Sequence, residues 1–205
     1  MLVEELKTGT RVLTLEGGHA EVVGVYKRSI STAELQDNPK LFPVRIAKGA
    51  LGNGLPQRDL LVSRQHRMLA ASPIVQRMFE TSEVLVSAIL LTDLPDIAVD
   101  DQVSNVTYFH IVFEEHQVIF AEGAPTESLL LNTEALKSLP CAVRDELEAI
   151  LPVLCQGPIT ASARQIPERP RQKKMCERHA KNARYLLASF ETQNRKTEHV
   201  GVTAK

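Results

Sequence analysis

The chain has 205 residues, of which 43% are hydrophobic and 24% are charged, and it contains no tryptophan. This length suits one domain with an appendage, and this composition excludes wholesale disorder, a collagen-like repeat and a coiled coil. The formal net charge of −1 hides two regions of opposite sign. Residues 160–205 carry eleven basic and four acidic side chains, a balance of +7, so residues 1–159 carry the remaining 13 and 21, a balance of −8. We therefore expect the organisation of the chain to change near residue 160.

Nothing in the pattern indicates export or membrane insertion. Residues 1–5 lack the basic and apolar stretches of a signal peptide. The longest nearly apolar run, Val84 to Leu91, is far shorter than the roughly 20 residues of a membrane span. The three cysteines, Cys141, Cys155 and Cys176, are odd in number and have no metal-site or redox spacing. We expect reduced thiols, no membrane span and, by default, a cytoplasmic location.

The first 122 residues have the composition of short strands separated by turns. Strands are expected over residues 11–15, 20–27, 43–46, 59–63, 67–70 and 83–91. Two further strands, over 103–113 and 116–122, flank Glu114 and Glu115 and are expected to pair as a hairpin. Many short strands at close spacing predict a mainly β core of barrel or sandwich type.

The pattern changes after Gly123. Short helices are expected over 133–139 and 140–151, then a proline-rich linker over 156–170 and a basic helix over 172–190. These boundaries predict a β domain at 1–130, a helical follow-on packed on it at 131–158, and a linker with a basic helical tail at 159–205. The charge of residues 160–205 would suit an anionic partner such as nucleic acid or a membrane surface, although solvated helix faces are often basic as well.

The histidines carry the candidate chemistry. Ser63 and His66 form a Ser-x-x-His unit, in which the hydroxyl could orient the ring and the ring could protonate a departing amide nitrogen. His110 and His116 lie on either side of the expected turn. The spacing by itself does not distinguish a catalytic histidine from a structural or exposed one at any of these three positions. No metal-site spacing, Walker A pattern or Rossmann fingerprint is present, so neither a metal nor a cofactor is expected.

Three stretches taken together resemble the Hint (Hedgehog/intein) domain, in the bacterial variety often attached to large secreted proteins. They are VEELKTGTRVLTLEGG (3–18), VRIAKGALGNGLPQRDLLVSRQHRML (44–69) and YFHIVFEEHQVIFAEGAPTES (108–128). The resemblance implies a compact horseshoe of short strands, followed here by C-terminal helices. In active relatives, an N-terminal Cys or Ser attacks the preceding carbonyl, and the histidine of a Thr-x-x-His motif stabilises the departing amide nitrogen. The resemblance implies catalytic positions at Ser63 (in place of Thr), His66 and His116, with His110 just upstream of His116.

Two departures from the family pattern shape the expected activity. The family's nucleophile lies before the segment that matches residues 3–6, so we expect the chain as written to be truncated and inactive. The three cysteines cannot replace it, because an acyl shift needs the thiol beside the scissile carbonyl. Inteins end in His-Asn, whereas Gly123 is followed by APTES, so splicing is not expected. The resemblance thus implies N-terminal self-cleavage from an upstream polypeptide in cis. The alternative function is a non-catalytic interaction module with a basic tail. No motif supports a conventional enzyme that acts on a small molecule.

Overall fold

The computed structural model describes residues 1–130 and 161–191. Its strands are β1 Arg11–Leu13, β2 His19–Glu21, β3 Gly24–Ile30, β4 Val44–Ile46, β5 Leu60–Val62, β6 Arg67–Ala70, β7 Val84–Ser87, β8 Ile97–Val99, β9 Val106–Val112, β10 Val118–Ala121 and β11 Ala124–Glu127. Its helices are α1 Thr32–Asp37, α2 Pro73–Phe79 and α6 Arg169–Lys181, with 3₁₀ turns η1 Val3–Glu5, η2 Pro39–Leu41 and η3 Ala88–Asp93. The helices expected over 133–151, and also Cys141 and Cys155, lie outside the described residues.

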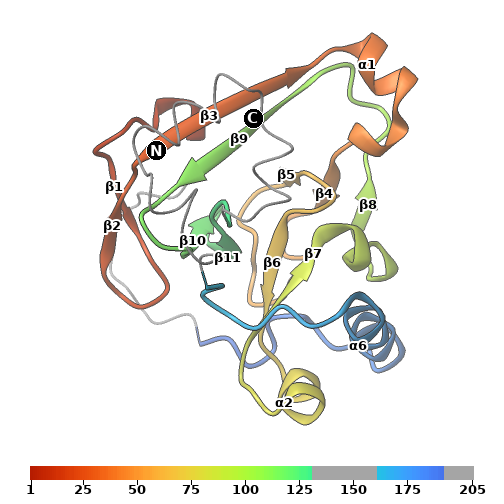
Figure 1. Cartoon of the computed structure of the whole chain (residues 1–205). Coiled ribbons are helices and arrows are strands. Elements are labelled where there is room, and N and C mark those ends of the chain that lie inside the picture. The colour runs from red at the N-terminus through yellow and green to blue at the C-terminus, as the bar shows by residue number, and fades with distance from the viewer. Residues whose placement is uncertain (131–160, 192–205) are drawn as a thin grey trace.

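The described strands form four small antiparallel sheets. In Figure 1 the long β3–β9 ribbon runs along the top, β5 and β4 lie beneath it with β8 to their right, and β6 and β7 lie below them, with their sheet partners β10 and β11 to the left. A hairpin of β1 and β2 completes the N-terminal end, as the glycines after Leu15 predicted. The expected mainly β fold of short strands is confirmed, and of the C-terminal helices expected after it the described residues contain α6.

The prediction that residues 103–113 and 116–122 pair with each other as a hairpin is wrong. β9 pairs with β3 along its whole length, from Val106 opposite Ile30 to Val112 opposite Gly24. β10 pairs instead with β11. The turn between them has two successive residues with positive φ, Glu122 at 49° and Gly123 at 76°, which is the backbone that tight hairpins with right-handed twist prefer. The acidic pair Glu114 and Glu115 therefore joins two sheets rather than two paired strands.

Two helices were not expected from the hydrophobic pattern, although both begin with a capping residue. Ser31 accepts a hydrogen bond from the main chain of Glu34 and, with the Glu34 carboxylate, forms a capping box at the start of α1. Ser72 accepts a hydrogen bond from the Val75 main chain at the start of α2, and Pro73 occupies the first turn. Both helices are shorter than two full turns, too short to show a helical period.

The C-terminal segment of the described chain packs into the main core. The fully buried apolar side chains of α6 and of the turn that follows it are Met175, Cys176, Leu186 and Leu187. They share one cluster with side chains from β4 to β7, α2 and η3. Burial is the largest cause that raises the pKa of the Cys176 thiol, to about 12. The domain boundary near residue 159 stays a prediction, but residues 161–191 do not form a solvated tail.

The Gly-Asn-Gly loop at residues 52–54 holds this segment in place. Gly52 has φ of +99°, and a Cβ on it would lie 2.5 Å from the Cβ of Tyr185, so only glycine allows this approach. The Asn53 side chain donates to the carbonyls of Leu187 (2.9 Å) and Phe190 (2.8 Å). The glycines thus serve both loop geometry and the docking of a segment more than 130 residues away.

A buried histidine links α6 to the start of α2. The His179 Nδ1 lies 2.9 Å from the carbonyl of Met175, and Nε2 lies 2.9 Å from the Ser72 hydroxyl. Because a carbonyl only accepts, Nδ1 carries the hydrogen and Ser72 donates to Nε2. Burial lowers the pKa of His179, against the opposing effect of the bond to Met175. The ring is therefore neutral at neutral pH.

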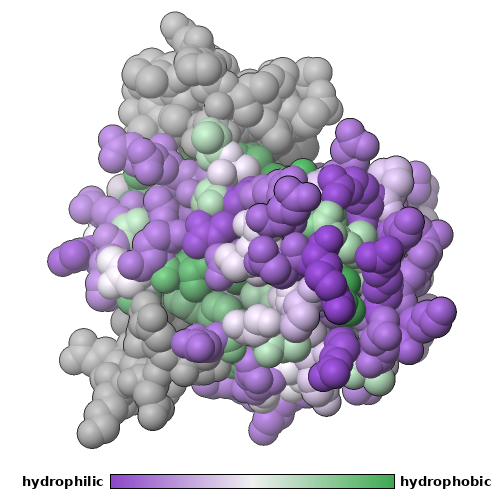
Figure 2. All heavy atoms as spheres, turned by 90° about the horizontal axis from the view of Figure 1, so that it is seen from below, coloured by the Kyte–Doolittle hydropathy of each residue, from purple (hydrophilic) through white to green (hydrophobic). Residues whose placement is uncertain are grey.

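The charged side chains of α6 point away from the core. Its exposed residues include Arg169, Lys173, Lys174, Arg178 and Lys181, and hydrophilic side chains cover much of the face seen from below (Figure 2). The anionic partner expected for this region stays a prediction. In the described ranges, no helix combines the length and the apolar character that crossing a membrane requires.

We expect Leu186→Ala to lower the free energy of unfolding by about 2–5 kcal/mol, because it opens a cavity in the main core. Urea unfolding measures the change. The neighbouring Tyr185 is 60% exposed, so Tyr185→Ala serves as the control and should cost less than about 1 kcal/mol. Equal and small effects would show that the segment does not belong to the core.

Candidate functional site

His66 ends the tight turn between β5 and β6. Its main-chain N–H donates to the carbonyl of Ser63 at 3.1 Å, and its carbonyl accepts the N–H of Ala88 at 2.8 Å. A further bond from Ile89 to the carbonyl of Arg64 attaches the turn to η3. Ser63 is thus joined to His66 through the main chain, and within the described ranges its hydroxyl makes no hydrogen bond. The Ser-x-x-His spacing therefore sets a turn, with the hydroxyl left available.

The ring of His66 contacts β11. Its Nε2 is hydrogen-bonded to the hydroxyl of Thr126, and that hydroxyl also donates to the carbonyl of Arg67 at 3.1 Å. The hydroxyl has one hydrogen, and the carbonyl of Arg67 is a stronger acceptor for it than the Met68 sulfur at 3.3 Å. With the hydrogen on that carbonyl, the hydroxyl oxygen accepts from His66, and the neutral ring then carries its hydrogen at Nε2. The other nitrogen, Nδ1, is then an acceptor, and it has no hydrogen-bond partner within residues 1–130 and 161–191.

The electrostatic surroundings keep His66 uncharged at neutral pH. Burial is the largest cause that lowers its pKa; the charge of Arg67 lowers it further, as does that of His110 or His116 whenever either ring is protonated. The charge of Glu127 acts in the opposite direction and raises the pKa. The net pKa lies below that of an ordinary histidine, so the ring readily returns a proton once it has taken one.

Glu127, the residue after Thr126, lies at the centre of a buried polar cluster. Its carboxylate accepts the main-chain N–H of Arg67 at 2.8 Å and the Arg67 guanidinium at 2.9 Å. The Nε2 atom of His116 lies 3.6 Å from the same carboxylate. Burial raises the pKa of Glu127, but His116, His66 and Arg67 together outweigh it and leave the pKa below its ordinary value. Glu127 is therefore a carboxylate at neutral pH.

His110 approaches His66 from the β3–β9 ribbon. It lies opposite Tyr26 in the ribbon and is near enough for its charge to lower the pKa of His66. Burial, and then the charge of Arg28, lowers the pKa of His110 itself. The structure thus brings the three predicted histidines to one region, and Ser63 to its edge; their catalytic roles stay predictions.

Sequence reasoning missed Arg67, Thr126 and Glu127. A signal was present in β11, where the sequence Ala-Pro-Thr-Glu is buried at every position. A charged residue inside a buried strand has to be paired, but burial is not visible in these four letters. In the described part of the chain, no three side chains of the metal-binding types converge closely enough to hold a metal ion.

Comparison with protein families matches the Hint domain over residues 1–133. The chain belongs to the Hint domain family. The match covers Ser63, His66, His110, His116 and Glu127, and its family is one of autoprocessing domains, so the general type of function is self-processing. No match was found among curated proteins or among solved structures. Residues 161–191, which lie beyond the match, fold back onto the Hint domain.

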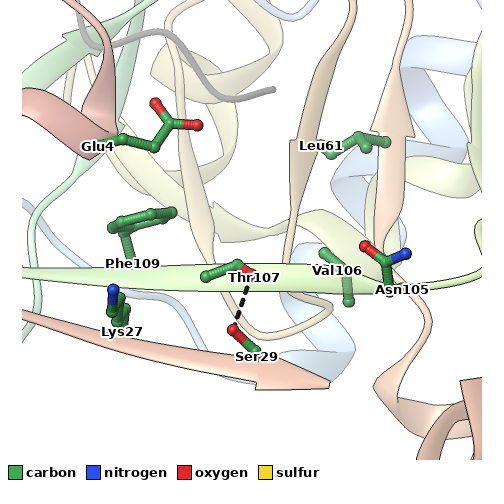
Figure 3. Close-up of a pocket in the computed structure, with 8 residues that line it drawn as sticks. All are labelled: Glu4, Lys27, Ser29, Leu61, Asn105, Val106, Thr107 and Phe109. Atoms are coloured by element: carbon green, nitrogen blue, oxygen red, sulfur yellow. Dashed lines mark hydrogen bonds between the residues drawn. The ribbon is translucent and has the colours of Figure 1, made fainter. Parts of the chain in front are cut away.

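A separate hollow lies on the other face of the β3–β9 ribbon. Figure 3 shows Lys27 and Phe109 on the ribbon below Glu4, with Leu61 across the hollow, and the Ser29–Thr107 hydrogen bond along its floor. Because side chains alternate along a strand, these ribbon residues face away from Tyr26 and His110. The hollow contains none of the predicted site residues.

We expect the stability of the fold to fall as the pH drops below about 6.5, the ordinary pKa of histidine. His66, His110 and His179 all have lowered pKa values in the folded state. The unfolded chain therefore binds more protons in that window, which costs at most about 1.4 kcal/mol per pH unit for each histidine. Urea unfolding from about pH 7.5 to about pH 5.5 measures the slope.

Two variants test whether the buried histidines cause this pH dependence of stability. His179→Gln should make the slope shallower, whatever its effect on absolute stability. His19→Gln, at an exposed position of β2, should leave the slope unchanged. A stability independent of pH in this window would contradict the neutral, buried state of these rings.

Proposed function

We propose that this Hint domain serves N-terminal self-cleavage through a thioester, with His66 as the group that moves the proton. The observation that supports this best is the buried ring of His66, whose Nε2 is hydrogen-bonded to the Thr126 hydroxyl and whose Nδ1 has no partner in the described part of the chain. We further propose that the 205 residues do not cleave by themselves, because the one cysteine of the described residues, Cys176, lies buried in the main core and away from His66.

The proposed step exchanges one bond to the carbonyl carbon for another. The thiol sulfur bonds to the carbonyl carbon of the preceding residue, and the bond from that carbon to the amide nitrogen breaks. The thiol proton passes to Nδ1 of His66 and then to the departing nitrogen, which leaves as an amine. A neutral ring with a lowered pKa suits both halves of this transfer, since it accepts the proton only transiently.

The other residues act around this proton transfer. The nearby carboxylate of Glu127 stabilises the imidazolium while it exists, since its charge raises the pKa of His66. The available hydroxyl of Ser63 would hydrogen-bond the carbonyl under attack. Burial and the charge of Arg67 keep the ring neutral before cleavage, while His110 and His116 line the same region. Cys176 is unsuited as the nucleophile, because it is fully buried and its pKa is raised to about 12.

The coding sequence upstream of Met1 gives the first test. An in-frame cysteine followed by a strand-forming segment would provide the nucleophile that the proposal requires. In the protein that includes this segment, dithiothreitol should accelerate cleavage by intercepting the thioester. His66→Ala should slow cleavage by about 10²–10⁴-fold, the usual contribution of general acid–base catalysis. Electrophoresis with mass spectrometry of the fragments measures both effects.

His19→Ala is the matched control, since His19 is an exposed histidine of the same domain, and it should cleave at the wild-type rate. The 205-residue chain alone should give no fragment with dithiothreitol. Cleavage that is indifferent to both thiol and His66 would exclude the mechanism. A longer protein that never cleaves would favour the interaction module, for which the exposed basic side chains of α6 are the candidate surface.

A further inference from the structure

His116 is held from two sides by parts of the chain that are far apart in sequence. Its side chain is fully buried. Its Nδ1 accepts the main-chain N–H of Ala163 at 3.0 Å, with the hydroxyl of Ser162 at 3.4 Å. Its Nε2 faces Glu127 at 3.6 Å and has no closer hydrogen-bond partner in the described ranges. Nδ1 thus receives its hydrogen bond from a residue outside the Hint match at 1–133, and Nε2 faces Glu127 at the centre of the site.

The contact with Ala163 determines which nitrogen carries the hydrogen. A main-chain N–H can only donate, so Nδ1 has to present its lone pair and the neutral ring carries its hydrogen at Nε2. That hydrogen points toward the carboxylate of Glu127. The opposite tautomer would place a lone pair against the carboxylate and leave a buried N–H against the N–H of Ala163. Both contacts would then be repulsive.

The segment that supplies this N–H is anchored independently of His116. The Arg164 guanidinium pairs with Glu83 at 2.6 Å and with Glu16 at 2.8 Å. The carbonyl of Gln165 accepts the N–H of Leu85 at 2.9 Å, so the segment continues the sheet beyond the edge strand β7. Ile166 packs with a small cluster around Leu85. The position of Ala163 is therefore set by the sheet and by two ion pairs.

We propose that residues 161–166 are a positioning element of the Hint site, in which the main-chain N–H of Ala163 fixes the Nε2–H tautomer of His116. Through Glu127, this orientation supports Arg67 and the strands β6 and β11, between which His66 binds Thr126. The consequence for cleavage rests on the proposed function. The tautomer itself does not, because it is a property of the folded chain whether or not the chain cleaves.

The full 205-residue chain, labelled with ¹⁵N, tests the tautomer directly by NMR of the imidazole nitrogens, well above the ordinary pKa of histidine. His116 should show a protonated Nε2 and an unprotonated Nδ1. Ala163→Pro removes the N–H donor and should shift both His116 nitrogens toward the values of mixed tautomers. Ser162→Ala removes only the more distant hydroxyl and should leave the Nε2–H tautomer in place. A protonated Nδ1 in the wild type, or an equal change in both variants, would overturn the assignment.

A second variant tests how residues 161–166 are anchored, in case Ala163→Pro displaces all of them. Arg164→Gln removes both ion pairs and keeps the main chain, so it should speed hydrogen exchange of the Ala163 amide by roughly 3–10-fold, the effect of two partly exposed ion pairs. Arg169→Gln, at an exposed arginine at the start of α6, should leave that rate unchanged. Equal rates in both variants would show that Arg164 does not anchor the donor.

Discussion

The fold depends on satisfying one buried carboxylate, that of Glu127. A buried charge costs several kcal/mol unless partners surround it, and the partners of Glu127 come from separate parts of the chain. Arg67 supplies both its main chain and its side chain from β6, and His116 approaches from before β10. The strands of the central sheet can satisfy the carboxylate only in one register. Since Thr126 precedes Glu127, the same register places a hydroxyl against His66.

This arrangement leaves histidines that are close together but uncharged. Burial lowers the pKa of both His66 and His110, and the resting site therefore holds one carboxylate and one guanidinium rather than a group of imidazolium ions. A proton that enters such a site has a defined acceptor in Nδ1 of His66 and a nearby negative charge. The proposed self-cleavage needs this combination: a base that is neutral at rest and an acid that is strong once charged.

Much of the fold was predictable, because strand composition and turn residues act locally. The β1–β2 hairpin, β4 and β6 follow from such patterns, and the resemblance placed His66, His110 and His116. The partner of β9 was not predictable, because pairing with β3 depends on residues about 80 positions away. The docking of α6 was missed for a related reason: prolines and charges indicated a linker and a tail, while Met175 and Leu186 pack against a core that the sequence does not identify. Glu127 was missed because its burial depends on all of these pairings together.

The most direct test of the central role of Glu127 is a double-mutant cycle with Arg67, measured by urea unfolding. Arg67→Met and Glu127→Gln should each be destabilising, because the first leaves the buried carboxylate, and the second the partly buried guanidinium, without its partner. The double variant should then be more stable than the sum of the single effects predicts, by at least about 1.5 kcal/mol. Additivity to within about 0.5 kcal/mol would contradict the account, since residues that do not interact show no coupling beyond that range.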